Sequence, residues 1–174
     1  MPQGFPDYWV EKAAHTPLVV IGCHDYVPAF GQASYGAWPV ANLGLFMPIT
    51  INEAVTIKRM FVNMTGTSGN ADVGIYDEDG KRLVSVGGFG VPTAGQTMSI
   101  DIADTLLEAG RYYLAVVCNS TVPQFLRWVP VSLGGNLIFG VREVAAAYPL
   151  PATVTYYDHA TRSYIAAVAA TLQA

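Results

Sequence analysis

Short apolar runs separated by turn residues follow one another from about residue 42 to the end of the chain. Within residues 98–102 and residues 72–76, aliphatic side chains alternate with polar, small or aromatic ones. Alternation with a period of two places Val73 and Ile75 on the core side of a strand and their neighbours on the opposite side. Many short strands with turns between them are typical of a β-sandwich or barrel. The expected strands are residues 43–51, 55–64, 71–76, 83–86, 98–102, 111–118, 124–129, 136–141, 152–157 and 163–169.

Three of these segments carry a further structural signal. Asp79-Gly80 lies between two strand-like runs and predicts a hairpin, because Gly accepts the positive φ that the turn requires. Residues 111–118 are apolar or aromatic on both faces, so this strand is either central in the fold or pressed against a partner. Leu107, Gly110 and Tyr112 are similar to the corner of sandwich domains, where the phenol bonds back to the chain.

The first forty residues lack the short alternating runs of the rest of the chain. Asp7 is placed to cap a short helical turn over residues 8–14, which Thr16-Pro17 would end. From there to about Val40 the chain is rich in Gly, Pro and aromatic residues and has no clear period. We therefore predict an all-β protein with an extended N-terminal arm over residues 1–40 and a single antiparallel, jelly-roll-like β-sandwich over residues 41–174.

The composition is unusually apolar. Of the 174 residues, 52% are hydrophobic and only 13% are charged, whereas soluble domains carry about 25% charged residues. Either the chain is a membrane protein or neighbouring subunits cover much of its surface. The apolar runs are shorter than the roughly 20 residues of a spanning helix, which favours a covered subunit.

The start of the sequence and the net charge limit where the protein is expected to act and which partners it is expected to bind. The first residues lack the basic region and apolar run of an export signal, so we expect synthesis in the cytoplasm and no membrane insertion. The net charge of −4 and the lack of a basic block argue against nucleic acid as a partner.

The sequence offers little for catalysis or metal binding. The histidines His15, His24 and His159 accompany no GxSxG nucleophile motif. The acidic turn at residues 77–80 has the oxygen ligands that calcium prefers, but without an EF-hand loop a solvated hairpin turn is the favoured interpretation. The glycines of residues 87–90 precede no phosphate-loop Lys and favour a loop or a close backbone approach. We expect no catalytic residue, metal or cofactor.

The two cysteines are far apart and form no CxxC motif. Two buried, reduced thiols are the favoured interpretation for a protein that is not secreted. A disulfide between Cys23 and Cys118 remains the alternative.

Aromatic residues near the N-terminus are the candidate binding residues. Such side chains stack on sugar rings and also anchor protein interfaces. We favour contact with a partner protein, because a core role is less natural in an arm. The candidate partner-binding residues are Phe5, Tyr8, Trp9, Tyr35 and Trp38.

Two stretches resemble a known type of domain. The first stretch is residues 70–84, with the sequence Asn-Ala-Asp-Val-Gly-Ile-Tyr-Asp-Glu-Asp-Gly-Lys-Arg-Leu-Val, and the second runs from Asp101 through Gly110 to Ala115. Both resemble small jelly-roll domains of tailed-bacteriophage virion proteins, which are similar in shape to carbohydrate-binding modules. The resemblance covers roughly residues 55–117 and consists of turn glycines, core aliphatic residues and the corner tyrosine.

The resemblance implies a non-enzymatic virion structural protein, as a head decoration, minor capsid, neck or tail component. Such a protein is made in the host cytoplasm, binds other virion proteins through apolar surfaces and an N-terminal arm, and forms a homo-oligomer, with a trimer favoured. Coverage by neighbours would explain the apolar composition.

Two other functions remain open. A carbohydrate- or host-receptor-binding module predicts an exposed aromatic strip flanked by Asn, Asp or Arg. A hydrolase acting on a cell-wall or capsule polymer would need two carboxylates about 5–10 Å apart in a groove.

Overall fold

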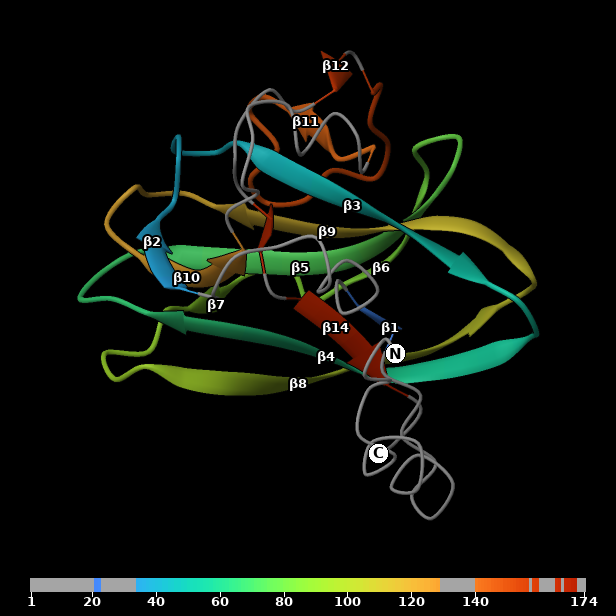
Figure 1. Ribbon diagram of the computed structural model, residues 1–174, viewed down its shortest axis with the longest axis horizontal. Helices are drawn as coiled ribbons and strands as arrows, with labels where there is room; N and C mark the ends of the chain where they lie inside the picture. Colours follow the sequence, from blue (N-terminus) through green and yellow to red (C-terminus); the bar gives the residue numbers. More distant parts are fainter. Residues whose placement is uncertain are drawn as a thin grey trace, which may run out of the picture.

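The computed structural model describes residues 21–22, 34–128, 140–156, 158–159, 165–166 and 168–171. Every regular element in these residues is a β-strand, and the strands form two antiparallel sheets that pack face to face (Figure 1). The predicted all-β sandwich is thus confirmed. Within the same residues, the structure contains no helix long and apolar enough to cross a membrane.

The first sheet, sheet A, is organised around strand β4. β8 pairs along one side of β4, whereas β14 and β10 pair along the other side (Figure 1). β1 pairs with β14, and both β2 and β13 pair with β10. The strands of sheet A are β1 (Ile21–Gly22), β2 (Ser34–Ala37), β4 (Val55–Thr65), β8 (Gln96–Leu107), β10 (Gln124–Trp128), β13 (Ile165–Ala166) and β14 (Val168–Thr171).

The second sheet, sheet B, is organised around strand β9. β9 lies between β3 and β5, β11 and β12 extend the sheet beyond β3, and β6 and β7 pair with the far side of β5. Both faces of β9 are apolar because Leu114 and Val116 lie in one buried cluster and Tyr113 and Val117 in another. The strands are β3 (Gly44–Ile51), β5 (Asn70–Asp77), β6 (Arg82–Ser85), β7 (Phe89–Gly90), β9 (Gly110–Cys118), β11 (Arg142–Val144) and β12 (Asp158–His159).

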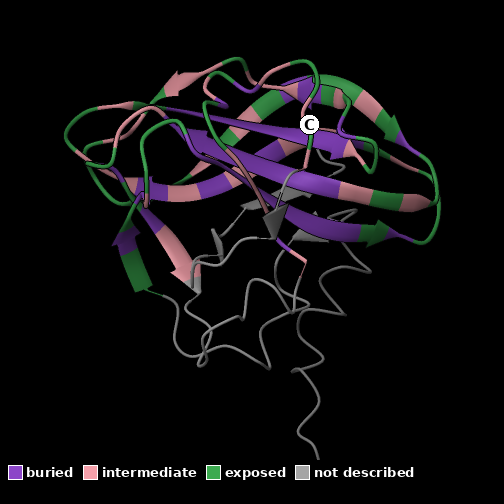
Figure 2. Ribbon diagram, turned by 90° about the horizontal axis from the view of Figure 1, so that it is seen from above, coloured by how far each residue is buried: buried purple, intermediate pink, exposed green. Residues whose placement is uncertain are grey.

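The main core lies between the two sheets. Met60, Val62 and Met64 alternate along β4 and are almost fully buried, as the period of two requires. They pack in one cluster with Val73 and Ile75 of β5, which confirms the core-facing positions predicted for these two residues. Most buried residues lie in the strands, whereas exposed residues lie in the loops and also along parts of some strands, such as β8 (Figure 2).

A second buried layer covers the outer face of sheet B. Phe46, Tyr76 and Tyr113 point away from the main core, yet they are buried against residues of the segment 145–156, which we call the strap. The predicted outward direction of Tyr76 is therefore right, but its surroundings are apolar. The strap itself was predicted in part as a strand over residues 152–157; within the described residues it forms only an isolated bridge between Lys81 and Thr153.

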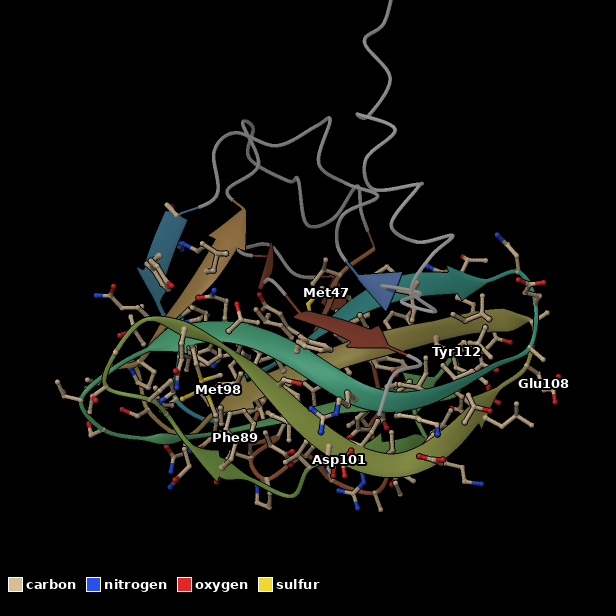
Figure 3. All side chains as sticks on the ribbon, turned by 90° about the horizontal axis from the view of Figure 1, so that it is seen from below. Met47, Phe89, Met98, Asp101, Glu108 and Tyr112 are labelled. Carbon is tan, nitrogen blue, oxygen red and sulfur yellow. The ribbon has the colours of Figure 1, made fainter. Side chains whose placement is uncertain are left out.

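The two predicted local motifs are present. In the β5–β6 hairpin, the Asp77 carboxylate accepts hydrogen bonds from the backbone N–H groups of Asp79 (3.1 Å) and Lys81 (2.8 Å), and Gly80 has a φ of 84°. At the β8–β9 corner, the Tyr112 hydroxyl donates to the carbonyl oxygen of Glu108 at 3.0 Å. Figure 3 shows both corner residues at the same end of the sandwich.

The sandwich begins earlier than predicted. β1 and β2 precede residue 41, and β2 pairs with β10 over four residue pairs. The boundary was placed too late because this pairing joins residues 87 to 93 positions apart, which no local pattern reveals. Residues 1–20 and 23–33, including the expected helical turn, lie outside the described residues, as do residues 136–139 of another expected strand. The last expected strand corresponds to β13 and β14.

Candidate ligand-binding face

The five candidate partner-binding residues have different positions. Phe5, Tyr8 and Trp9 lie outside the described residues. Tyr35, on β2, is 41% exposed. Trp38, only four positions after the start of β2, is 1% exposed and belongs to the main core.

Trp38 was expected on a free arm, and the structure corrects this expectation. Its ring packs on Phe125 with the centroids 4.7 Å apart, and its indole N–H donates to the carbonyl oxygen of Leu43 at 3.0 Å. A buried Trp adds a large apolar area to a core when its N–H finds an acceptor. Because β2 pairs with β10, the chain carries Trp38 directly onto Phe125 of that strand.

Tyr35 begins a row of polar side chains on the outer face of sheet A. Its hydroxyl donates to Oδ1 of Asn63 on β4 at 2.5 Å, and Nδ2 of Asn63 donates to Oγ1 of Thr97 on β8 at 2.9 Å. Asn63 alternates with the buried Val62 and Met64 and therefore faces outward. The row crosses three strands and holds both Tyr35 and Asn63 in fixed orientations.

A second row runs parallel to the first across β4 and β8. Nη1 of Arg59 donates to Oγ of Ser99 at 3.0 Å, and Nε of Arg59 lies 3.7 Å from Oδ1 of Asp101, which is near the middle of β8 (Figure 3). Beside this row, Nζ of Lys58 lies 3.5 Å from Oδ2 of Asp104. A β-bulge between Ile57 and Arg59 interrupts the alternation here, and the ion pairs of both Lys58 and Arg59 reach side chains of β8.

Phe61 lies between the two rows. It is half-buried, it pairs in register with Ser99, and it belongs to neither buried cluster of the described residues. Successive outward residues on a strand are roughly 6.6 Å apart, so the surface from Arg59 past Phe61 to Asn63 is roughly 13 Å long. We call this surface the outer strip; it consists of Tyr35, Arg59, Phe61, Asn63, Thr97, Ser99 and Asp101.

The charges on this face are balanced. The charged residues of β4 are Lys58 and Arg59, those of β8 are Asp101 and Asp104, and each cation has a carboxylate within 3.7 Å. The described strands of sheet A contain one more charged residue, Arg127 on β10. It lies two positions after the buried Phe125 and therefore faces inward, on the same side of the strand.

The remaining candidates for chemistry do not assemble in the described part of the chain. No group of three or more His, Cys, Asp or Glu residues is close enough there to hold a metal ion. The acidic turn uses Asp77 to bind its own backbone, as a structural turn does. His15 and His24 lie outside the described residues, and so does the side chain of His159.

Cys118 is a free, buried cysteine, and burial raises the pKa of its thiol. A raised pKa keeps the thiol protonated and unreactive. Cys23, its possible disulfide partner, lies outside the described residues.

Most of the outer strip was not predicted. No sequence signal marks Asn63, Thr97 and Arg59 as binding residues, because polar residues commonly face outward from a strand. The alternation of β8 did indicate that Ser99 and Asp101 face away from the core. The hydrogen bonds of the strip join residues 28 to 40 positions apart, so only the strand pairing brings them together.

Comparisons with known proteins give a distant structural likeness. The sequence matches no family model, and no curated protein is significantly similar to it. Among solved structures, a carbohydrate binding module (CBM6cm-2) from Cellvibrio mixtus lichenase 5A, in complex with cellotriose, is 13% identical with a TM-score of 0.39. The match covers 63% of this chain and 92% of that chain. We draw no functional inference from a likeness at this distance.

Proposed function

We propose that this protein is a non-enzymatic carbohydrate-binding module and that its ligand lies along the outer strip. The observation that supports the proposal is the grouping, on one face, of two partly exposed aromatic rings with an amide, hydroxyls and a guanidinium. This is the surface expected for the carbohydrate alternative, an aromatic strip flanked by Asn, Asp and Arg.

The side chains of the strip suit the chemistry of a sugar. Phe61 and Tyr35 supply apolar ring surface for the C–H groups of a pyranose. Asn63, Arg59 and Asp101 supply donors and acceptors for hydroxyl groups, and such polar groups orient a ligand on an otherwise apolar site.

The strip is also organised before any ligand arrives. Tyr35, Asn63 and Thr97 bind one another, and Arg59 binds Ser99. Side chains that are already ordered lose little rotamer freedom on binding, which favours affinity. Their place on paired strands adds rigidity that a loop would lack.

The test is glycan binding by the full chain and by single variants. We expect the wild type to bind members of an oligosaccharide panel, and Phe61→Ala and Tyr35→Ala to weaken binding at least about tenfold, which corresponds to about 1.4 kcal/mol. Leu106→Ala is the matched control, because Leu106 is 59% exposed on β8 but lies outside the strip. A wild type that binds no glycan, or strip variants that bind as well as the control, would refute the proposal.

The virion role implied by the sequence resemblance is a second proposal, and that resemblance alone supports it. Its test is incorporation into particles by a triple variant, Phe5→Ala with Tyr8→Ala and Trp9→Ala. Loss of incorporation with an unchanged melting temperature would support an N-terminal anchor, and normal incorporation would refute it. Trp38 is unsuitable for this test, because removing a core side chain would unfold part of the sandwich.

A further inference from the structure

We infer that the outer strip selects neutral oligosaccharides and that Asp101 and Asp104 exclude acidic ones; this inference rests on the proposed function. It starts from the charge balance of the strip together with the Lys58–Asp104 pair beside it. Two cations and two carboxylates face outward, and they are paired as Lys58 with Asp104 and Arg59 with Asp101. No unbalanced positive charge is left on this face of the described strands to attract an anion.

The greater exposure of the two carboxylates is the reason why acidic ligands, and not basic ones, are excluded. Asp101 and Asp104 are 76% and 63% exposed, whereas their cationic partners are 35% and 36% exposed. A ligand that approaches from solvent therefore meets the carboxylates more than the cations. A uronate or sulfate group would be repelled by them and would have to displace Asp101 from Arg59.

Neutral hydroxyl groups have no such competition. The Arg59 guanidinium carries five N–H donors, and its one hydrogen bond, to Ser99, uses Nη1. Nε of Arg59 is buried. The remaining N–H groups on Nη1 and Nη2, with the acceptor oxygens of Asp101, can serve a hydroxyl that both donates and accepts. Asp101 thus helps to bind neutral sugars while it repels anionic ones.

The inference predicts the effect of removing the two negative charges. The double variant Asp101→Asn with Asp104→Asn keeps the shape of both side chains and leaves Lys58 and Arg59 without counter-charges. We expect its affinity for oligosaccharides carrying sulfate or uronate groups to rise by roughly tenfold at low salt, and this gain to disappear at about 1 M salt, where the Debye length is near 3 Å. Affinity for neutral oligosaccharides is expected to fall, because Asp101→Asn replaces one acceptor oxygen by an NH2 group.

The experiment measures the full chain against one panel of neutral oligosaccharides and the same oligosaccharides bearing sulfate or uronate groups, at low and high salt. The matched control is Glu78→Gln with Asp79→Asn, which changes the net charge equally but lies in the exposed β5–β6 turn of the opposite sheet. We expect the wild type and the control to bind neutral members with little salt dependence.

Three results would count against the inference. A wild type that prefers the acidic members, with salt-dependent affinity, would overturn it and leave carbohydrate binding intact. A gain of acidic binding in the control equal to that of the strip variant would also overturn it, because the effect would then be one of net charge. A protein that binds neither class would overturn the proposed function and the inference together.

Discussion

Asp72 is a carboxylate with no exposed surface, on the outer face of β5 beneath the strap. Its Oδ1 accepts from the backbone N–H of Gly87 at 3.1 Å, and its Oδ2 accepts from that of Leu150 at 3.0 Å. One side chain therefore ties the β6–β7 loop and the strap to the same strand. The sequence predicted that Asp72 faces away from the main core, but not that it is buried.

Removing the carboxylate should destabilise the fold. Asp72→Ala removes the acceptor of the buried Leu150 N–H and of the Gly87 N–H, which belongs to an exposed residue. An unsatisfied buried group costs about 1–3 kcal/mol. We expect the free energy of unfolding in urea to fall by at least this amount. The control Asp79→Ala, in the exposed turn, should change it by less than about 0.5 kcal/mol. Equal stabilities of the two variants would contradict this role of Asp72.

Asp72 should also give stability a distinct pH dependence. Burial raises the pKa of Asp72 above its ordinary value of 3.8, although the N–H groups of Leu150 and Gly87 oppose the shift. The folded state then holds the proton more tightly than the unfolded state, so the contribution of Asp72 is greatest at low pH and declines as pH rises through its folded pKa. The free energies of unfolding of the wild type and of Asp72→Asn are measured from pH 3 upward. Because Asn does not titrate, their difference gives the contribution of Asp72 to the pH dependence. We expect the stability of the wild type relative to Asp72→Asn to decline with rising pH; a rise would contradict the raised pKa.

At the scale of elements, the strap completes sheet B. The Tyr76 hydroxyl donates to the Pro151 carbonyl oxygen at 2.6 Å, and the Val154 N–H donates to that of Gly80 at 2.8 Å. Arg82 adds a backbone N–H bond to the Ala152 carbonyl oxygen at 2.9 Å. These bonds replace a regular strand pairing and place Ala147 and Leu150 over the aromatic residues of β3, β5 and β9. The chain thus covers this face for itself, whereas the sequence had left open whether β9 is central in the fold or pressed against a partner.

Truncating the strap's main apolar contact tests this role. Leu150 is 1% exposed, and Leu→Ala in a packed core costs about 2–5 kcal/mol. We expect Leu150→Ala to lower the free energy of unfolding by this amount and to speed amide exchange in residues 147–154. Leu106→Ala, at an exposed position, is the control. A Leu150 variant as stable and as protected as that control would show that the strap does not pack as described.

At the scale of the whole molecule, the apolar composition has a structural explanation within the chain. Two buried layers, one between the sheets and one beneath the strap, need more apolar residues than a single core. Within residues 34–127 and 140–156, for which side chains are described, the large hydrophobic residues with an exposed surface are Tyr35, Val40, Leu83, Leu106 and Val122. The low share of charged residues therefore does not require coverage by other subunits.

The position of Trp38 predicts how the whole fold responds to its loss. A buried Trp→Ala change costs about 3–5 kcal/mol, a large part of the stability of a typical domain. We expect Trp38→Ala to lower the melting temperature sharply, whereas a residue on a free arm would leave it unchanged. Thermal unfolding beside the exposed-site variant Tyr35→Ala distinguishes these outcomes. An unchanged melting temperature for Trp38→Ala would restore the arm interpretation of this residue.

The sequence by itself determined the all-β class, most strands between residues 43 and 128, the Asp-Gly hairpin and the tyrosine corner. These features depend on side-chain alternation and turn chemistry, which act over a few residues. Only the tertiary structure decided that Trp38 belongs to the core and that the strap covers the second apolar face of β9. It also decided that Tyr35, Asn63 and Thr97 form one row. Each of these depends on strand pairing between distant segments, and a period of two shows which residues share a face but not which strand lies beside them.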